Sequence, residues 1–305
     1  MARVDAVLLL AFGGPERAED VRPFLDEVLR GRPVPRERYE EVVRHYDAIG
    51  GRSPLNAWTF RQADALRALL ERDGPRLPIY VGMRTWKPTI ADTLATMACD
   101  GVHRALVVIL AAHRTEASWE RYQQAVEDGR AAVGASAPHV EYARRWFDHP
   151  DFVAAVAARA REALSNAPAD AELVFTAHSI PCAMAEASPY VRELETSCAL
   201  VATALSRPYA LAYQSRSGGP REPWLGPDVN EHLRARAAAG ARHVVLVPIG
   251  FVCDHVEVLY DLDVEARATA AAVGLGLARA ETVNDHPIFI RMLAAVVRAG
   301  ADRRE

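Results

Sequence analysis

The chain has 305 residues, of which 50% are hydrophobic and 25% charged, as expected for a globular protein large enough for two packed cores. Its 36 Lys and Arg residues against 40 Asp and Glu residues give a formal net charge of −4, which excludes the basic footprint of a nucleic-acid-binding protein. The four cysteines are scattered without a CxxC pair, which argues against a zinc ribbon or a disulfide framework. No apolar run resembles a signal peptide or approaches the ~18 residues of a transmembrane segment, so we expect a cytoplasmic protein.

Apolar runs of strand length recur along the chain, with amphipathic helical stretches between them. Strands that are apolar throughout and alternate with helices are typical of parallel sheets covered on both faces. The pattern therefore predicts two α/β halves. The runs are residues 6–12, 77–83, 105–113 and 139–146 in the first half, and 171–180, 209–215, 243–252 and 274–283 in the second.

The two halves also resemble each other in sequence. Residues 87–113 align without gaps on residues 226–252, an offset of 139, and residues 147–158 match residues 284–295 at an offset of 137. Two matches at nearly one offset indicate a structural duplication. The segments that follow the third strand of each half then occupy equivalent places, at the sheet edge where open α/β folds bind ligands, and we expect them to face one cleft.

The stretch FTAHSIP, residues 175–181, places His178 where a buried strand gives way to a turn. A single histidine is often a structural residue whose ring nitrogens are both hydrogen-bonded. Its position at a strand end, just before Pro181, equally suits a functional residue on a loop. Both interpretations remain open from this motif alone.

Residues 254–265, DHVEVLYDLDVE, form what we call the acidic segment. Glu257, Asp261 and Glu265 are spaced i, i+4, i+8, and each step of four residues drifts only about 40° around an α-helix, which predicts a ridge of three carboxylates. Like charges at this spacing cost a few tenths of a kcal/mol per pair. The sequence has no Lys or Arg between residues 254 and 266 to offset them.

Two interpretations of this ridge compete. A run of charge is usually a solvated helix face, and we assign Asp263, which is off the ridge, to such a surface. The ridge itself follows a buried strand and begins with Asp254, His255 and Glu257, a mixture of carboxylate and imidazole. Imidazole with carboxylate suits Fe²⁺, whereas oxygen ligands alone suit Mg²⁺, so the segment predicts a divalent-cation site.

These segments together resemble the ferrochelatase family, the enzymes that insert ferrous iron into a porphyrin. The matching stretches, in the order of the family, are LLLAFGGP, HYDAIGGRSPL, GMRTWKP, FTAHSIP, YQSRSGGPREPWLGP and PIGFVCDHVEVLYDLDVE, from residue 8 to residue 265. The resemblance implies the chelatase fold: two Rossmann-like domains, residues 1–146 and 147–305, with an active-site cleft between them and a C-terminal helix packed back on the first.

The resemblance also implies roles for individual residues. His178 and Glu257 match the pair that faces the porphyrin at the iron site, and Asp261 and Glu265 match acidic residues on a distorted helix that can hold a second cation such as Mg²⁺. Which member of the pair accepts the pyrrole protons stays open. The family's porphyrin-contact positions fall on Phe12, Arg30, His45, Tyr46, Ser53 and Tyr122.

The porphyrin is expected to be coproporphyrin III, because the opening stretch and the spacing before HYDAIGGRSP look more like that branch of the family. Some members of the branch carry a tyrosine where this chain has Phe12, so an axial phenolate cannot form here. Protoporphyrin IX is the alternative substrate. A cobaltochelatase is disfavoured by Glu257, where such enzymes are expected to carry histidine, and a non-catalytic haem carrier is the alternative from another class.

The same resemblance sets expectations for cofactors and partners. Ferrous iron and the porphyrin are substrates, and no iron–sulfur cluster is expected, because the cysteine-rich tail of some members is missing: the last cysteine is Cys253. We expect a monomer without a transmembrane segment that meets other enzymes of haem biosynthesis transiently.

Overall fold

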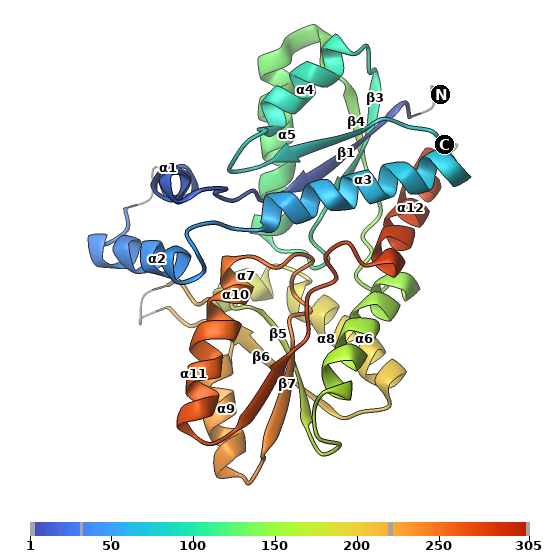
Figure 1. Cartoon of the computed structure of the whole chain (residues 1–305). Helices are drawn as coiled ribbons and strands as arrows, with labels where there is room; N and C mark the ends of the chain where they lie inside the picture. Colours follow the sequence, from blue (N-terminus) through green and yellow to red (C-terminus); the bar gives the residue numbers. More distant parts are fainter. Residues whose placement is uncertain (1–3, 31–32, 219–221, 303–305) are drawn as a thin grey trace. The chain divides into compact units, whose positions relative to one another are not determined.

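The structure is a computed structural model that describes residues 4–30, 33–218 and 222–302. Each predicted strand is present in it, and the strands form two parallel sheets of four, in the orders β2-β1-β3-β4 and β6-β5-β7-β8 (Figure 1). The first sheet contains β1 (Ala6–Ala11), β2 (Ile79–Met83), β3 (Arg104–Ile109) and β4 (His139–Tyr142). The second contains β5 (Glu172–His178), β6 (Tyr209–Gln214), β7 (His243–Val247) and β8 (Gly276–Arg279).

Helices flank both sheets, so the predicted α/β class is confirmed. In the first half they are α1 (Val21–Val28), α2 (Arg36–Ala48), α3 (Leu55–Asp73), α4 (Ile90–Cys99) and α5 (Arg121–Val133). They continue with α6 (Pro150–Ser165), α7 (Cys182–Glu186), α8 (Tyr190–Leu205) and α9 (Val229–Ala238). The last are α10 (Val256–Leu259), α11 (Arg267–Ala272) and α12 (Pro287–Ala301).

The duplication expected from the sequence is visible in how the elements begin. Thr89 caps α4 by accepting a hydrogen bond from a backbone N–H, and Asp228, 139 residues later, caps α9 in the same way. His149 and His286, 137 residues apart, cap α6 and α12, each followed by proline at the first helical position. These caps satisfy donors that the first turn of a helix leaves unpaired, so the repeated motif fixes helix starts in both halves.

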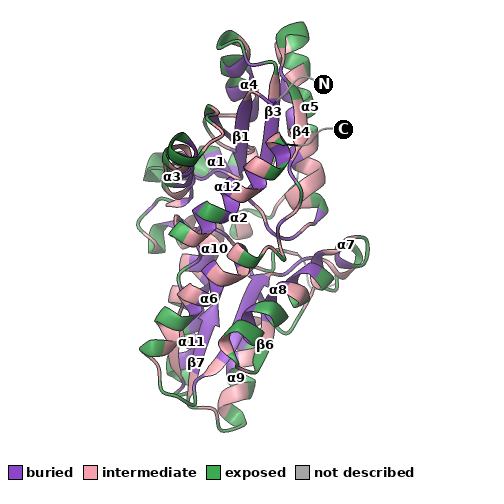
Figure 2. Cartoon of the chain, turned by 90° about the vertical axis from the view of Figure 1, so that its right-hand side faces the viewer, coloured by how far each residue is buried: buried purple, intermediate pink, exposed green. Residues whose placement is uncertain are grey.

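Buried strands form the core of each sheet (Figure 2). Strands β1 and β3 pack through Leu8, Leu10 and Val107 against Leu94 and Met97 of α4. In the second sheet, Val174 and Leu246 pack against Leu233 of α9 and against apolar residues of the acidic segment. The acidic segment is therefore fixed to the sheet by its apolar side, which leaves its carboxylates on the other side.

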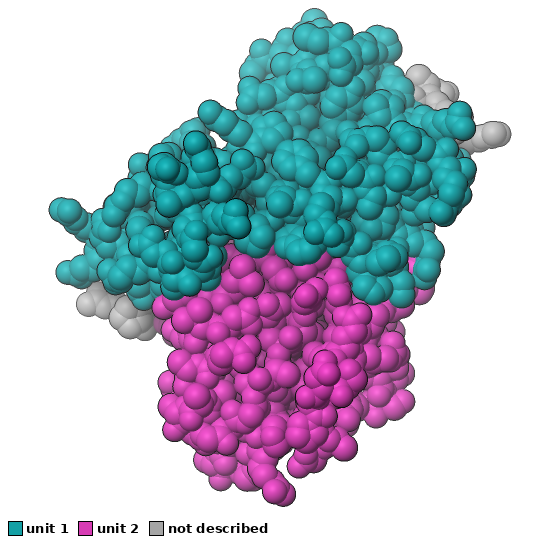
Figure 3. All heavy atoms as spheres, viewed as in Figure 1, with its two compact units in different colours: residues 1–111, 116–146, 285–305 teal, residues 112–115, 147–284 magenta. Residues whose placement is uncertain are grey.

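The chain divides into two compact units, and each is considered by itself. Unit 1 comprises residues 1–111, 116–146 and 285–305, and unit 2 comprises residues 112–115 and 147–284 (teal and magenta in Figure 3). Helix α12 packs against α3 and β3 and so belongs to unit 1, whereas α6 packs against α8 and β7 in unit 2.

Some predicted strands end earlier than their apolar runs. The run 243–252 leaves the sheet after Val247, because Pro248 has no N–H to donate to a neighbouring strand. The run 139–146 leaves it after Tyr142. Within the described part of the chain, no helix has the length and apolar character needed to cross a membrane.

Candidate functional site

His178 is the last residue of β5, and both its main chain and its ring make hydrogen-bond contacts. Its backbone carbonyl accepts a hydrogen bond of 2.9 Å from the hydroxyl of Tyr190, the first residue of α8. The ring Nδ1 contacts the Ser179 carbonyl, which can only accept, so Nδ1 carries a proton. This arrangement leaves Nε2 as the ring atom available to a ligand.

Glu257 lies opposite this nitrogen. Its Oε1 is 3.5 Å from Nε2 of His178, and both side chains are partly exposed, 38% for Glu257 and 30% for His178. The backbone around Glu257 is fixed on two sides, because its N–H donates to Nδ1 of His255 and its carbonyl accepts from the Gln214 side chain. The structure thus brings together the two residues that were predicted to form the iron-site pair.

The protonation states of this pair are coupled. Burial disfavours an imidazolium at His178, but the Glu257 carboxylate, the Ser179 carbonyl and Asp261 outweigh this and raise the pKa of His178 to about 9. Burial also disfavours a charged Glu257, yet His178 and His255 lower the pKa of its carboxyl to about 2. The pair is therefore an imidazolium–carboxylate ion pair at neutral pH.

The acidic segment is not the regular helix that its spacing predicted. After the single turn of α10, residues Asp261–Ala266 form a π-helix, in which the N–H groups of Val264 and Glu265 both donate to the Tyr260 carbonyl, at 3.0 and 2.9 Å. A π-turn holds one extra residue, so Asp261 and Glu265 do not continue the α-helical ridge of Glu257. Such turns occur often at functional sites.

Asp261 is buried and accepts a hydrogen bond from the Ser215 hydroxyl. Burial is the main reason that the pKa of its carboxyl is raised to about 7, and the negative charges of Glu257 and Glu265 add to the effect. Asp261 can therefore take up and release a proton near neutral pH. Glu265 is exposed and accepts a hydrogen bond of 3.2 Å from the Asn230 side chain.

The remaining carboxylates of the segment have a basic partner that the sequence did not reveal. Arg279, at the end of β8, contacts Asp254 at 3.1 Å and forms a two-point pair with Asp263 at 2.5 and 3.0 Å. The assignment of Asp263 to a solvated surface was wrong, because its carboxylate pairs with a largely buried guanidinium. Arg279 lies outside the segment in sequence and joins it only through the pairing of β8 with β7.

Sequence reasoning also missed Ser215, Gln214 and Asn230. Gln214 is the last residue of β6 and Ser215 follows it, in the YQSR motif that was quoted only as a resemblance, and Asn230 lies in the first turn of α9. A signal for Ser215 and Gln214 existed, because β6 and β5 are parallel neighbours whose carboxyl ends meet at one sheet edge. Residues 219–221 of the same motif lie outside the described residues.

The porphyrin-contact residues expected in the first half all lie in unit 1. Phe12 packs edge-on against Phe24, with ring centroids 6.2 Å apart, and Phe24 packs in the same way against Tyr46. The guanidinium of Arg84 lies over the rings of Phe12 and Tyr122, at 4.8 and 5.3 Å. Phe12, Tyr46 and Tyr122 are therefore parts of one aromatic and cationic cluster.

The other three predicted residues, Ser53, His45 and Arg30, differ in their burial and in their contacts. Ser53 is buried, and its backbone N–H donates to the Pro15 carbonyl, which ties the YDAIGGRSP turn to the FGGP turn. His45 is partly buried beside Glu41, and burial lowers the pKa of its ring. Arg30 is exposed and pairs with Glu27, and Gly31 and Arg32 of the LRGR motif lie outside the described residues.

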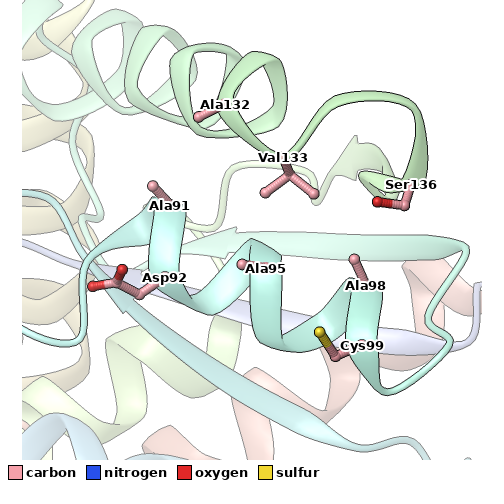
Figure 4. Close-up of a pocket in the computed structure, with 8 residues that line it drawn as sticks. All are labelled: Ala91, Asp92, Ala95, Ala98, Cys99, Ala132, Val133 and Ser136. Atoms are coloured by element: carbon pink, nitrogen blue, oxygen red, sulfur yellow. The ribbon is translucent and has the colours of Figure 1, made fainter.

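The described residues contain no ready metal cage, and the hollow in unit 1 between α4 and α5 is separate from the predicted site. In residues 4–30, 33–218 and 222–302, no group of three or more His, Cys, Asp and Glu side chains is arranged to hold a metal ion. A hollow of about 430 Å³ lies between α4 and α5, lined by small side chains such as Ala95, Ala98 and Ala132 (Figure 4). It contains none of the residues expected to act on a substrate.

Sequence comparison gives a consistent result over the whole chain. A family model described as Ferrochelatase matches residues 4–301. The coproporphyrin III ferrochelatase of Nocardia farcinica is 45% identical over 312 residues, which cover 98% of this chain and 89% of that protein. The coproporphyrin III ferrochelatase of Mycolicibacterium smegmatis is 44% identical, with 96% and 88% covered. A protein of Rhodopirellula baltica named ferrochelatase is 42% identical, with 96% and 85% covered.

Solved structures with the same fold are distant in sequence. A multi-domain protein of Deinococcus radiodurans, described as similar to chelatases, has a TM-score of 0.63 at 18% identity, and the match covers this whole chain but 56% of that one. The sirohydrochlorin chelatase of Bacillus subtilis subspecies spizizenii in complex with cobalt has a TM-score of 0.57 at 13% identity, with 98% and 96% covered. At these identities the likeness concerns the fold alone, and it confirms the predicted chelatase fold.

Proposed function

The chain belongs to the ferrochelatase family, so it is a metal-insertion enzyme with ferrous iron and a porphyrin as substrates, and we propose that the porphyrin is coproporphyrin III. One observation carries this proposal: relatives that are 44–45% identical over 96–98% of the chain are named coproporphyrin III ferrochelatases. Protoporphyrin IX is the second candidate, since the Rhodopirellula baltica relative is named without a porphyrin.

We propose His178 and Glu257 as the residues that act on the metal and on the pyrrole protons. The 3.5 Å contact between Nε2 and Oε1 supports this proposal, because it joins an imidazole and a carboxylate at the carboxyl end of a parallel strand. In the resting pair Nε2 is protonated, so His178 must lose this proton before the nitrogen can bind Fe²⁺ or accept a pyrrole proton. Asp261, with a pKa near 7, is suited to receive protons that leave the pair.

We further propose that Asp261 and Glu265 guide cations toward the pair and bind Mg²⁺ as an outer ion. Carboxylate oxygens are the ligands that Mg²⁺ prefers, and Ser215 and Asn230 add further oxygen atoms beside them. Porphyrin binding is assigned to the residues of unit 1, namely Phe12, Arg30, His45, Tyr46, Ser53 and Tyr122. Arg84, which lies over Phe12 and Tyr122, is a cationic partner for a propionate in the same cluster.

The test is anaerobic iron insertion by the purified protein into each of the two porphyrins. Coproporphyrin III has four propionates and protoporphyrin IX two. We expect kcat/KM for coproporphyrin III to exceed that for protoporphyrin IX by at least about tenfold, because each cationic group of the protein that loses a propionate partner costs about 1.4 kcal/mol or more. Equal values, or a preference for protoporphyrin IX, would contradict the choice of substrate. Tight porphyrin binding without insertion into either would contradict the reaction.

A further inference from the structure

Arg279 joins two carboxylates that lie at opposite ends of the acidic segment. Its Nη1 is 3.1 Å from Oδ1 of Asp254, while Nε and Nη2 contact the two oxygens of Asp263 at 3.0 and 2.5 Å. The side chains of Arg279 and Asp254 are each only 10% exposed. A planar guanidinium that meets a carboxylate at two points fixes orientation as well as distance, so this contact determines the geometry of the segment.

The first of these carboxylates is anchored a second time. Oδ2 of Asp254 accepts a hydrogen bond of 3.1 Å from Asn284, and the Asp254 N–H donates at 3.0 Å to the Asn284 side-chain oxygen. Thr282 donates to the same oxygen from its hydroxyl, at 2.9 Å. Arg279 itself pairs with Leu246 in the β7–β8 register. Asp254 and Arg279 therefore fix the position of the acidic segment relative to the second sheet.

Both functional carboxylates of the proposed site lie between the two points held by Arg279. Glu257 is three residues after Asp254, and Asp261 is two residues before Asp263. The intervening helix α10 has four residues, too few to be stable by itself, and the π-turn that follows is a rare conformation. The direction in which Glu257 points toward His178 thus depends on how the two ends are held, in addition to the backbone contacts of Glu257 with His255 and Gln214.

Arg279 also changes the charge of the segment. The five carboxylates from Asp254 to Glu265 include two, Asp254 and Asp263, that share this one guanidinium. Without it, Asp254 would lose this ion pair and Asp263 would keep only its contact of 3.7 Å with Arg267, so more of their charge would repel Glu257, Asp261 and Glu265. Arg279 therefore compensates Asp254 and Asp263, and leaves Glu257, Asp261 and Glu265 to interact with His178 and with an incoming cation.

We propose that Arg279 is a positioning residue for metal insertion, which holds the acidic segment so that Glu257 and Asp261 present their carboxylates to incoming ferrous iron. This inference rests on the proposed roles of His178 and Glu257. It predicts that loss of the contacts of Arg279 with Asp254 and Asp263 lowers kcat/KM for ferrous iron and leaves the affinity for porphyrin unchanged.

The test compares Arg279→Met and Arg279→Lys with a matched control, Arg159→Met. Arg159 is in the same unit and also joins two carboxylates, Glu162 and Glu281, each at 3.1 Å, but neither belongs to the acidic segment. We expect Arg279→Met to raise KM for ferrous iron and to lower kcat/KM for iron at least about tenfold, with the porphyrin Kd from fluorescence titration within about twofold of wild type. In Arg279→Lys, kcat/KM for iron should lie between the values of Arg279→Met and the wild type, because a compact ammonium keeps the charge but cannot reproduce the two-point contact.

Hydrogen exchange supplies a readout that is independent of turnover. The amides of Val264 and Glu265, which both donate to Tyr260, should exchange faster in the Arg279 variants and at the wild-type rate in Arg159→Met. Wild-type exchange at these amides, or a kcat/KM for iron that falls no more than in Arg159→Met, overturns the inference. If Arg279→Met does not fold, Arg279→Lys carries the comparison. Absence of insertion by the wild-type enzyme would instead contradict the proposed function, and the exchange data would still decide the role of Arg279.

Discussion

The carboxylates of the acidic segment separate into two sets according to their partners. Asp254 and Asp263 share the guanidinium of Arg279, so their charges stabilise the local structure. Glu257 instead pairs with His178, whose charge depends on its protonation, and Asp261 and Glu265 contact the neutral side chains of Ser215 and Asn230. The second set can offer negative charge to a cation once the imidazolium of His178 gives up its proton, which agrees with an enzyme that inserts ferrous iron.

Replacing Glu257 tests the central pair directly. In Glu257→Gln the side chain keeps its size but loses its charge and its ability to accept a proton, so we expect kcat/KM for iron insertion to fall by about 10² or more. Porphyrin affinity, measured by fluorescence titration, should stay unchanged. The control is Glu231→Gln on the exposed face of α9. A folded Glu257→Gln variant with half of the wild-type turnover would exclude Glu257 from the reaction.

His113 gives unit 2 a pH-dependent stability that is separate from the reaction. The ring is buried, its Nε2 is 3.0 Å from the Ser197 hydroxyl, and the rings of Phe152 and Tyr190 pack edge-on against it. Burial lowers the pKa of this imidazole to about 3, whereas an unfolded chain has a histidine pKa of about 6.5. Above pH 6.5 the ring is neutral in both the folded and the unfolded state. Below pH 6.5 it binds a proton in the unfolded state only, so the free energy of unfolding decreases as the pH is lowered.

The expected size of this effect at pH 5 is about 2 kcal/mol, from about 1.4 kcal/mol per pH unit below 6.5. We therefore expect the free energy of unfolding in urea to differ less between pH 8 and pH 5 in His113→Gln than in the wild-type protein, by about that amount. His139→Gln, at an exposed position on β4, should leave the difference unchanged. The same difference in His113→Gln as in wild type would show that His113 does not titrate on unfolding.

At the scale of single residues, the sequence predicted members of the candidate site but not their hydrogen-bond and ion-pair partners. His178 was predictable from its strand end, and Glu257 from its spacing and from the resemblance to a family. Arg279 could not be predicted, because it follows Asp263 by 16 residues and meets it only through sheet pairing and side-chain packing. Hydrogen bonds such as Ser215 to Asp261 depend on the same long-range geometry.

At the scale of elements, the duplicated helix caps offer a paired experiment. Thr89 and Asp228 occupy equivalent positions in the two halves, and each accepts from the first turn of its helix. We expect Thr89→Ala and Asp228→Ala each to lower the free energy of unfolding by about 1 kcal/mol, measured by urea denaturation. Arg234→Ala, exposed within α9, should change it by less than about 0.5 kcal/mol. Equal losses in all three variants would mean that the caps do not fix the helix starts.

The type of each element was easier to predict than its internal geometry. Apolar runs placed the strands correctly, because burial on both faces leaves a continuous hydrophobic pattern. The π-turn of Asp261–Ala266 left no such pattern, since an α-helix with the same residues would also bury Leu262 and Ala266. What distinguishes the two is a one-residue shift of backbone hydrogen bonds, which local sequence does not encode.

At the scale of the whole molecule, the two halves exchange a helix. Helix α6 follows β4 of the first sheet but packs against β7 of the second, and α12 follows β8 of the second sheet but packs against β3 of the first. The chain thus completes unit 1 only when its last helix is in place. Sequence position alone would assign α12 to the second half.

Two buried phenylalanines test this exchange, because they occupy equivalent positions in the exchanged helices. Phe289 of α12 and Phe152 of α6 are 137 residues apart, and both are fully buried; Phe289 packs against Trp146 with ring centroids 5.8 Å apart. Phe→Ala at either position should cost about 3–5 kcal/mol through a cavity. Hydrogen exchange should increase in β1 and β3 for Phe289→Ala, and in β5 and β7 for Phe152→Ala, since each cavity opens beside a different sheet. If the alanine variants do not fold, Phe→Leu variants take their place. Faster exchange in β5 and β7 for the Phe289 variants, with exchange in β1 and β3 unchanged, would show that α12 packs with the second half instead.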